Sequence, residues 1–299
     1  RRAAMGSLPQ LASTAAVFLA ACAFTANVGA VDTAPLHDES NTQIHGPRIS
    51  TVAFGSCRKQ QLPQPIWRAV LDLSPDMWLW TGDAIYPKPG AGEIEIRRAY
   101  ESAMSNKDAL AFFSAVPIVD GVYDDHDYGE NDGGKHFEMR EQSRLAFLDE
   151  VLQSPKDSPR RTQPGGLYGS RVFGTPPQQL KIIMLDTRFS RDSHAIPSPG
   201  GSKHLPKAGY LAGATRSMSA VFGIGQTHDG DVLGEDQWEW LRSQLTNSSA
   251  SVHLIVSSIQ VLTTVPAVES WGHFPASRKR LLSLLAELRP AGALLLSGD

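Results

Sequence analysis

The tetrapeptide Asp-Asp-His-Asp at positions 124–127 is the feature that most restricts how this chain can fold. It places carboxylates and an imidazole side by side, and burying such groups is costly unless a cation compensates their charge. The apolar run 115–119 comes just before it and predicts a buried strand. Proteins with α/β folds usually carry their ligand sites at the carboxyl ends of strands. We therefore expect the tetrapeptide to lie at such a strand end.

Other apolar runs also end in polar residues. The sequences at these ends are Gly-Ser-Cys-Arg at 55–58, Gly-Asp-Ala-Ile-Tyr at 82–86 and Gly-Asp at 298–299. Carboxylates that gather at two strand ends indicate a bound metal centre rather than a solvated surface.

The order of the remaining patterns predicts an α/β fold in which helices cover the faces of sheets. Strands are predicted at 49–54, 76–80, 114–119, 167–173, 180–185, 252–257 and 291–296. Helices are predicted at 65–73, 94–110, 138–152, 235–245 and 277–288. The neighbouring strands 167–173 and 180–185 are expected to form a hairpin. Residues 192–233 hold many Gly, Ser and Pro and are predicted to form a long connection.

The N-terminal residues are typical of a targeting segment. Residues 11–28 are small and apolar and carry no charge, which favours a cleaved signal peptide over 1–30. A membrane anchor is the alternative, because the run approaches the length of a spanning helix. The polar residues 31–48 are expected to form a flexible lead-in to a domain at 49–299. A secreted, extracellular protein is therefore expected.

The composition argues against some classes of function. Apolar residues make up 41% of the chain and charged residues 20%, as in ordinary globular proteins. The net charge is −3, and no basic stripe indicates a nucleic-acid-binding surface. No second apolar run is long enough to cross a membrane, so no stable span is expected once the signal is cleaved. We expect a monomer.

Seven short sequences in one order resemble a known family. They are Phe-Gly-Ser-Cys-Arg at 54–58, Trp-Thr-Gly-Asp-Ala-Ile-Tyr at 80–86, Asp-Asp-His-Asp-Tyr-Gly-Glu-Asn-Asp at 124–132, Leu-Asp-Thr-Arg at 185–188, Leu-Gly-Glu-Asp-Gln-Trp at 233–238, Ser-Ser-Ile-Gln at 257–260 and Ser-Gly-Asp at 297–299. Together they resemble the alkaline phosphatase D (PhoD-like) family of metallophosphoesterases. The resemblance implies a four-layer sandwich, with two mixed β-sheets flanked by helices, and a multi-metal phosphoesterase site.

The resemblance and the ligand chemistry together assign a two-metal centre. Asp83 is expected to bridge the two ions. Cys57 and Tyr86 are expected beside it, because a thiolate and a phenolate suit Fe(III). Asp125 and Asp299 supply hard oxygens, which suit Ca²⁺, with Mg²⁺ or another divalent ion as the alternative.

Three further residues complete the predicted site. Asn131 is expected to add an amide oxygen at the calcium position. The resemblance implies that His126 contacts the phosphate or acts as a general acid, and Arg58 is expected to hold the phosphate with two hydrogen bonds. The family pattern continues with a histidine two residues beyond Asp299, so the domain at 49–299 is expected to be incomplete at its C-terminal end.

Each of these residues also has a structural interpretation. Alone, Cys57 would be a buried core thiol, Tyr86 a core aromatic residue, and Asp83 a turn residue or helix cap. His126 would be a hydrogen-bonded loop residue. Asp186 and Arg188 are expected to form a structural ion pair.

We therefore expect a secreted metal-dependent phosphoesterase that hydrolyses phosphate monoesters or diesters through a metal-bound hydroxide. The expected partner is the phosphate ester substrate. One alternative is a phosphodiesterase that acts on lipid or polymer diesters, in a groove shaped by the 192–233 connection. The other is a degenerate, non-catalytic metal-binding protein of the same fold, because the sequence lacks the histidine expected beyond Asp299.

Overall fold

The computed structural model describes residues 47–88, 90–197 and 208–299. The predicted signal peptide or anchor at 1–30 and most of the lead-in at 31–48 lie outside these residues. Among the helices of the described part, none is both long enough and apolar enough to cross a membrane.

The first sheet has three parallel strands that follow their order in the chain. β1 (Val52–Gly55), β2 (Met77–Thr81) and β3 (Ile118–Val122) pair in the order β1-β2-β3. Every residue of β2 is buried. A central parallel strand is covered on both faces, which explains why the sequence of β2 is apolar without alternation.

The second sheet has four strands. They are β4 (Gly169–Phe173), β5 (Leu180–Met184), β6 (Val252–Ser257) and β7 (Ala293–Ser297), in the order β4-β5-β6-β7. β4 runs antiparallel to β5, which confirms the predicted hairpin, and β5, β6 and β7 are parallel to one another. This sheet is therefore mixed, whereas the described strands of the first sheet are all parallel.

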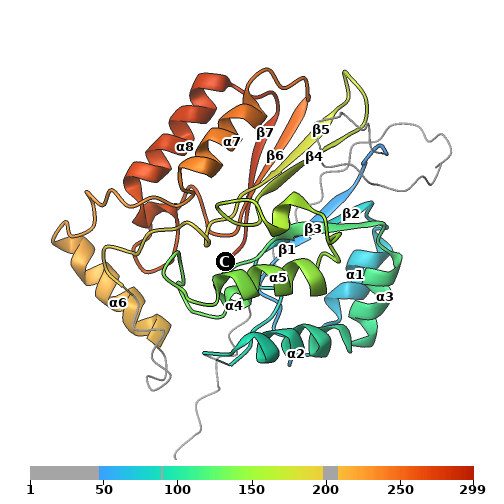
Figure 1. Cartoon of the computed structure of the whole chain (residues 1–299), viewed down its shortest axis with the longest axis horizontal. Helices are drawn as coiled ribbons and strands as arrows, with labels where there is room; N and C mark the ends of the chain where they lie inside the picture. The colour runs from blue at the N-terminus through green and yellow to red at the C-terminus, as the bar shows by residue number, and fades with distance from the viewer. Residues whose placement is uncertain (1–46, 89, 198–207) are drawn as a thin grey trace, which may run out of the picture.

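Alternating side chains of β5 show how the layers are stacked. Ile182 and Met184 lie in the core that also contains the residues of β1–β3. Ile183, between them, packs in a second core with α7 (Glu235–Leu245) and α8 (Pro275–Leu288). The two sheets therefore face each other, and α7 and α8 cover the outer face of the second sheet (Figure 1). This confirms the predicted four-layer α/β sandwich.

An aromatic cluster covers the outer face of the first sheet. The helices on this side are α1 (Ile66–Asp72), α2 (Glu93–Met104), α3 (Lys107–Ala115) and α5 (Arg140–Glu150) (Figure 1). The Trp78 ring of β2 lies 5.2 Å from the Trp67 ring of α1 and 5.5 Å from the Phe112 ring of α3, between centroids. Large aromatic rings packed edge to face in this way contribute strongly to core stability.

Two predicted boundaries near Asn106 are wrong. The single helix predicted at 94–110 is two helices, α2 and α3. The Asn106 side chain accepts hydrogen bonds from two backbone N–H groups at the start of α3 and so begins a new helix. α3 then takes the first residues of the strand predicted at 114–119. β3 therefore lies later in the chain than predicted and leads directly into the acidic tetrapeptide.

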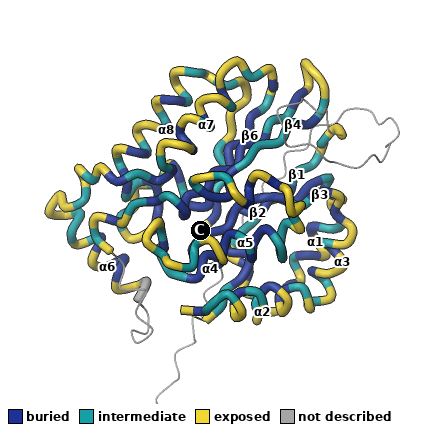
Figure 2. The backbone as a smooth tube through the Cα atoms, in the orientation of Figure 1, coloured by how far each residue is buried: buried dark blue, intermediate teal, exposed yellow. Residues whose placement is uncertain are grey.

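The connection predicted at 192–233 contains a helix, α6 (Ala208–Val221). It stands away from both sheets (Figure 1), and much of its surface is exposed (Figure 2). Its Gly and Ser residues have low helix propensity, which is why the composition favoured a loop. Two 3-10 helices, η1 (Pro159–Arg161) and η3 (Trp271–His273), lie in other connections.

The carboxyl ends of the parallel strands of both sheets meet at one edge, where residue 299 also lies (Figure 1). A Cβ atom on Gly298, after β7, would overlap the carbonyl oxygen of Thr81 at the end of β2. The two sheets therefore approach too closely here for any residue except glycine. α4 (Asp125–Tyr128) begins at the same edge, after β3. This convergence brings the polar residues of the strand ends together.

Candidate metal centre

Asp83 lies at the centre of the site, in a tight turn after β2. Its φ is +51° and that of Gly82 before it is +108°, so both residues are in a region that favours glycine. A Cβ atom on Gly82 would lie 2.5 Å from the Cβ atom of Asp124. Glycine therefore allows the turn after β2 to pack against the end of β3, and Asp83 is left only 2% exposed.

Replacing Gly82 with alanine is expected to lower the free energy of unfolding by more than about 3 kcal/mol, because a strained φ and a steric clash with Asp124 act together. Urea denaturation measures this loss. Gly223→Ala is the matched control, since Gly223 also has a positive φ (+73°) but its added Cβ would meet only the Gln226 side chain, at 3.9 Å. We expect a loss of about 1 kcal/mol there. Equal losses in the two variants would contradict the steric argument.

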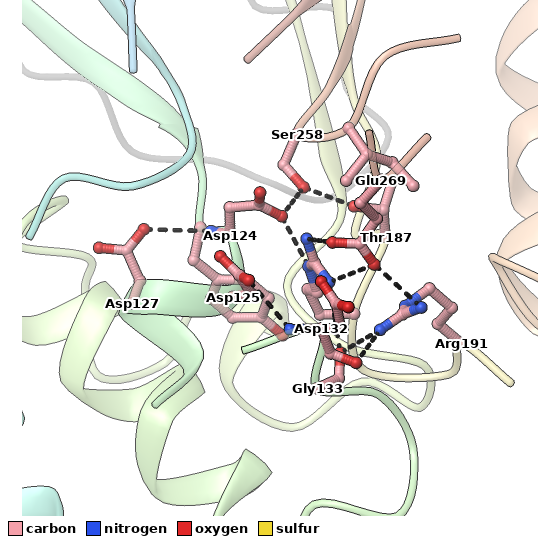
Figure 3. Close-up of polar contacts among 12 residues, drawn as sticks. Asp124, Asp125, Asp127, Asp132, Gly133, Thr187, Arg191, Ser258 and Glu269 are labelled. Atoms are coloured by element: carbon pink, nitrogen blue, oxygen red, sulfur yellow. Dashed lines mark hydrogen bonds and ion pairs between the residues drawn. The ribbon is translucent and has the colours of Figure 1, made fainter. Parts of the chain in front are cut away.

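Asp127, the last residue of the tetrapeptide, is turned into the protein. Its Oδ2 atom accepts hydrogen bonds from the backbone N–H groups of Asp124, at 3.1 Å, and Ala84, at 3.2 Å. Its Oδ1 atom accepts one from the Tyr100 hydroxyl at 3.0 Å. Figure 3 shows Asp127 beside the start of α4. Asp127 therefore fastens the end of β2 to the end of β3 and has no free oxygen for a ligand.

Asp125 and His126 lie against Asp83. One potential ligand atom from each of the three residues lies within 4.8 Å of the other two. The backbone N–H of His126 donates to Asp83 Oδ1 at 3.3 Å, and the backbone N–H of Asp132 donates to Asp125 Oδ2 at 2.9 Å. These bonds hold two carboxylates and an imidazole within reach of one cation.

The two residues predicted to bind iron, Cys57 and Tyr86, also contact Asp83. The Tyr86 hydroxyl donates to Asp83 Oδ2 at 2.6 Å, and the Cys57 Sγ atom lies 3.8 Å from the same oxygen. The Tyr86 ring packs against the His126 ring, with 4.0 Å between the centroids. The structure therefore gathers most of the predicted site residues around one carboxylate.

Asp83, Asp124, Asp125 and Asp127 are called the carboxylate cluster below. Burial, followed by repulsion from Asp125, holds the pKa of Asp83 well above its usual range. Burial also raises the pKa of Asp124 to about 6 and that of Asp127 to about 7. The pKa of His126 is lowered, again chiefly by burial. These shifts follow chiefly from burial, which makes a charged carboxylate costly unless a cation compensates it.

The donor set of the site fits a bound metal. The Oδ2 atom of Asp124 is buried and has no hydrogen-bond partner among the described residues, and such an atom is costly unless an ion or a water binds it. Carboxylate oxygens, an imidazole, a thiol and a phenol are all metal ligands in proteins. The side chains predicted to hold the metals, Cys57, Asp83, Tyr86 and Asp125, are among these donors.

Two further predicted ligands lie at the margin of this arrangement. The pKa of Asp299 is raised to about 9 by burial and then by the Asp124 carboxylate, so its side chain lies close enough to sense the cluster. Asn131 lies in the turn after α4, and its side chain makes no hydrogen bond within the described part of the chain. Like the other ligand assignments, these two stay predictions.

Arg58 packs behind the site. Its Nε atom donates to the carbonyl oxygen of Ala84 at 2.8 Å, and its guanidinium carbon lies 5.1 Å from the centroid of the Trp80 ring. Burial lowers the pKa of Arg58 to about 10. Arg58 therefore supports the turn that follows Asp83, and the phosphate contact predicted for it finds no support in this position.

The cation that contacts the carboxylate cluster is Arg188, which the sequence analysis did not place in the site. Its Nε atom donates to Asp124 Oδ1 at 2.6 Å, and its terminal nitrogens donate to both oxygens of Glu269, at 3.0 and 2.7 Å. The predicted ion pair of Arg188 with Asp186 is wrong. Asp186 instead accepts hydrogen bonds from backbone N–H groups and from the Tyr123 hydroxyl.

Asp124 joins the two sheets. It follows β3 of the first sheet, whereas its partners Arg188 and Ser258 follow β5 and β6 of the second. Ser258 Oγ donates to Asp124 Oδ1 at 2.5 Å and also lies 2.5 Å from the Thr187 hydroxyl (Figure 3). Arg188 and Ser258 belong to the sequences Leu-Asp-Thr-Arg and Ser-Ser-Ile-Gln, and the position of these sequences at strand ends was the only sequence signal for the two residues. No sequence signal indicated Glu269.

Replacing Arg188 with methionine is expected to lower the free energy of unfolding by about 3–5 kcal/mol, because Asp124 would stay buried without its cation and Glu269 would keep its contact with Arg191 but lose the one with Arg188. Urea denaturation of the metal-free protein measures this. Arg280→Met is the matched control, since it breaks an exposed pair with Glu235 and should cost less than about 1 kcal/mol. Similar losses in both variants would show that burial of the Arg188 pairs is not the cause.

A second group of potential ligands, Asp132, His194 and Glu269, is already neutralised by arginines. Arg216 contacts Asp132 at 2.6 Å, and Arg191 contacts Glu269 at 3.1 Å (Figure 3 shows Arg191 and Glu269). Burial lowers the pKa of His194 to about 3, so its ring is neutral at neutral pH. An ion-pair network explains this group better than a metal does. It is called the arginine network below and comprises Asp132, Arg188, Arg191, His194, Arg216 and Glu269.

Comparisons with known proteins agree with the fold and with the short sequences. The family model of the PhoD-like phosphatase matches residues 52–299. A solved structure described as "Structure of PhoD" is similar, with a TM-score of 0.58 and 19% sequence identity. The match covers 85% of this chain and 51% of that chain, so the chain spans about half the length of that structure. A search of curated proteins gave no match.

Proposed function

Because the chain belongs to the PhoD-like phosphatase family, we propose that it is a metal-dependent phosphoesterase. The observation that carries this proposal is the approach of Asp83, Asp125 and His126 to within 4.8 Å of one another at the meeting edge of two sheets. Their negative charge must be neutralised before a phosphate ester, itself an anion, can bind there. Bound cations would neutralise the carboxylates and would allow the anionic ester to bind.

The ligand chemistry favours two different ions. Cys57 and Tyr86 beside Asp83 favour Fe(III), and Asp125 with Asp299 favours Ca²⁺ or another divalent ion such as Mg²⁺. When bound, such ions polarise phosphoryl oxygens and lower the pKa of a water molecule. The turns after β1 and β2, the start of α4 and the residues after β7 position these side chains.

His126 is proposed to contact the phosphoryl group or the leaving oxygen. Its backbone is fixed by Asp83 and its ring by the ring of Tyr86. Burial lowers the pKa of His126, so the ring is neutral at neutral pH and offers one N–H donor and one acceptor nitrogen. Of the two roles expected for His126, this state suits a hydrogen bond to a phosphoryl oxygen better than it suits a general acid, which needs a protonated ring.

We propose phosphate monoesters and diesters as the substrates and a monomer as the active form. Secretion is proposed from the N-terminal residues 1–30, which resemble a signal peptide in composition. The diester alternative from the sequence analysis remains part of this proposal, because the geometry of the ligand residues suits both kinds of ester.

Metal content and hydrolysis measured on the same sample test the proposal. Elemental analysis would be combined with assays of p-nitrophenyl phosphate and bis(p-nitrophenyl) phosphate. The assays would use this chain and a version extended through the histidine that the family pattern places two residues after Asp299. We expect iron and calcium, with turnover that a chelator removes and the metals restore. Bound metal without turnover in both forms would favour the non-catalytic alternative, and absence of both metal and turnover would overturn the proposal.

A further inference from the structure

A cavity lies beside the arginine network, between α6 and the segment 264–275. Its volume is about 290 Å³, which is near the lower limit for cavities that bind small molecules. The residues relevant here are His194, Ile196, Arg216, Ile224, Thr264 and His273. This cavity is called the side pocket below.

Asp132 links the side pocket to the candidate metal centre. The Asp132 backbone N–H donates to Asp125 Oδ2 at 2.9 Å. The Asp132 carboxylate accepts a hydrogen bond from Arg216 Nη2 at 2.6 Å. Asp125 of the candidate metal centre and Arg216 of the side pocket therefore contact the same residue, Asp132.

Polar groups of the side pocket lack partners. Arg216 uses Nη2 for Asp132 and Nε for the carbonyl oxygen of Ile196, at 3.2 Å, and its Nη1 atom has no partner among the residues that the structure describes. The Nδ1 atoms of His194 and His273 are buried and also have no partner there. Arg216 is 6% exposed and His194 is 8% exposed. Buried polar atoms in native proteins normally bond to protein, water or a ligand.

The lining selects for negative charge. Among the described residues, the lining contains no Asp or Glu and no Trp, Tyr or Phe, so this part of it lacks the carboxylates and aromatic rings that recognise ammonium groups, and the nearby Asp132 carboxylate is paired with Arg216. A guanidinium with a free N–H is a strong donor to carboxylate and phosphate oxygens. Ile196 and Ile224 provide apolar walls for a short carbon chain.

We propose that the side pocket binds an anionic group, a carboxylate or a phosphate, carried on a short carbon chain by the ester whose phosphoryl group binds at Asp83 and Asp125. The preferred substrates are then phosphate esters with a second anionic group. This inference rests on the proposed function for its link to catalysis. The binding of an anion by the side pocket stands on the pocket's own residues.

A binding experiment on chelator-treated protein tests the side pocket independently of hydrolysis. Without metal, the carboxylate cluster repels anions, so binding of succinate or inorganic phosphate in a calorimeter reports on the side pocket. Ile224→Trp fills the pocket and should weaken anion binding about tenfold or more. Arg216→Lys should weaken it as well, because it replaces the planar guanidinium, with its several N–H donors, by an ammonium group. Met218→Trp is the matched control, because Met218 lies on α6, is 68% exposed and does not line the pocket.

A kinetic experiment tests the link to the substrate. Methyl p-nitrophenyl phosphate and 2-carboxyethyl p-nitrophenyl phosphate differ by a carboxylate on a short chain. We expect kcat/KM for the carboxyethyl ester to exceed that for the methyl ester about tenfold, and Ile224→Trp to abolish this ratio while Met218→Trp preserves it.

The outcomes separate the two proposals. Anion binding without hydrolysis of either ester would overturn the proposed function and leave the side pocket standing as an anion site. Hydrolysis of both esters with equal kcat/KM, and no anion binding by the metal-free protein, would overturn the side pocket and leave the phosphoesterase standing. Anion binding that is unchanged in Ile224→Trp would show that the anion binds elsewhere and overturn the inference.

Discussion

Replacing Asp83 with asparagine is expected to remove both metal binding and hydrolysis. Asp83 contacts Cys57, Tyr86 and the backbone of His126, so its carboxylate is the one group shared by the predicted ligands. Mutation of a group that only supports a metal ligand usually costs 10–100-fold in affinity or activity, and loss of the shared ligand should cost more than about 100-fold in kcat/KM. Elemental analysis and chromogenic ester assays measure the two effects.

The matched control for this variant is Asp236→Asn. Asp236 lies in the first turn of α7, is exposed, and is remote from the carboxylate cluster in sequence and in fold. It should keep its metal content and its activity. A full metal content in Asp83→Asn would show that Asp83 is not a ligand, and hydrolysis equal to that of the unaltered chain would show that the reaction occurs at another site.

Removing the metal is expected to make the stability of the protein strongly dependent on pH. Burial raises the folded-state pKa of Asp124 to about 6 and that of Asp127 to about 7, against about 3.9 in an unfolded chain. A group with a raised folded-state pKa contributes its full stability below the unfolded pKa and loses that contribution as pH rises through the folded pKa. The metal-free protein should therefore lose stability between about pH 4 and pH 8.

Thermal melting at pH 5 and pH 8, with and without a chelator, measures this effect. One pKa unit corresponds to about 1.4 kcal/mol. The raised pKa values of the cluster should lower the Tm of the chelated protein at pH 8, whereas His194, whose pKa is lowered to about 3, acts in the opposite direction below pH 6.5, so we expect a net decrease of about 5 °C. Asp83→Asn should show a smaller pH dependence, because one repelling carboxylate is gone, whereas Asp236→Asn should match the unaltered chain. A chelated protein that melts higher at pH 8 than at pH 5 would contradict the argument.

Local sequence was enough to predict the residues at the strand ends. Cys57, Asp83, Tyr86 and Asp125 each stand a few residues after an apolar run, and parallel strands bring such positions to one edge of a sheet. Their approach therefore follows from the order of strands and helices. The same reasoning predicted the hairpin of β4 and β5, since the turn between these strands is short.

The sequence patterns did not predict the contacts between segments that are distant in the chain. Glu269 lies in a connection with no periodicity, and only the packing of the second sheet on the first brings its carboxylate to Arg188. Arg58 stands next to Cys57, but the φ of Cys57 is +59°, so the backbone turns there and adjacency in the sequence does not place the two side chains on one side. The Arg58 side chain packs on Trp80 of the first sheet instead of facing the predicted ligands.

The link through Asp124 has a consequence for how the metal centre forms. Most of the predicted ligands, among them Cys57, Asp83, Tyr86 and Asp125, come from the first half of the chain, whereas the predicted ligand Asp299 and the cation that pairs with Asp124, Arg188, come from the second half. A fragment that contains only the first half would carry these side chains without Asp299 and without that counter-charge. Metal affinity then reports whether the two halves of the chain have docked. If the two halves are made separately and mixed, their association would increase the amount of metal bound.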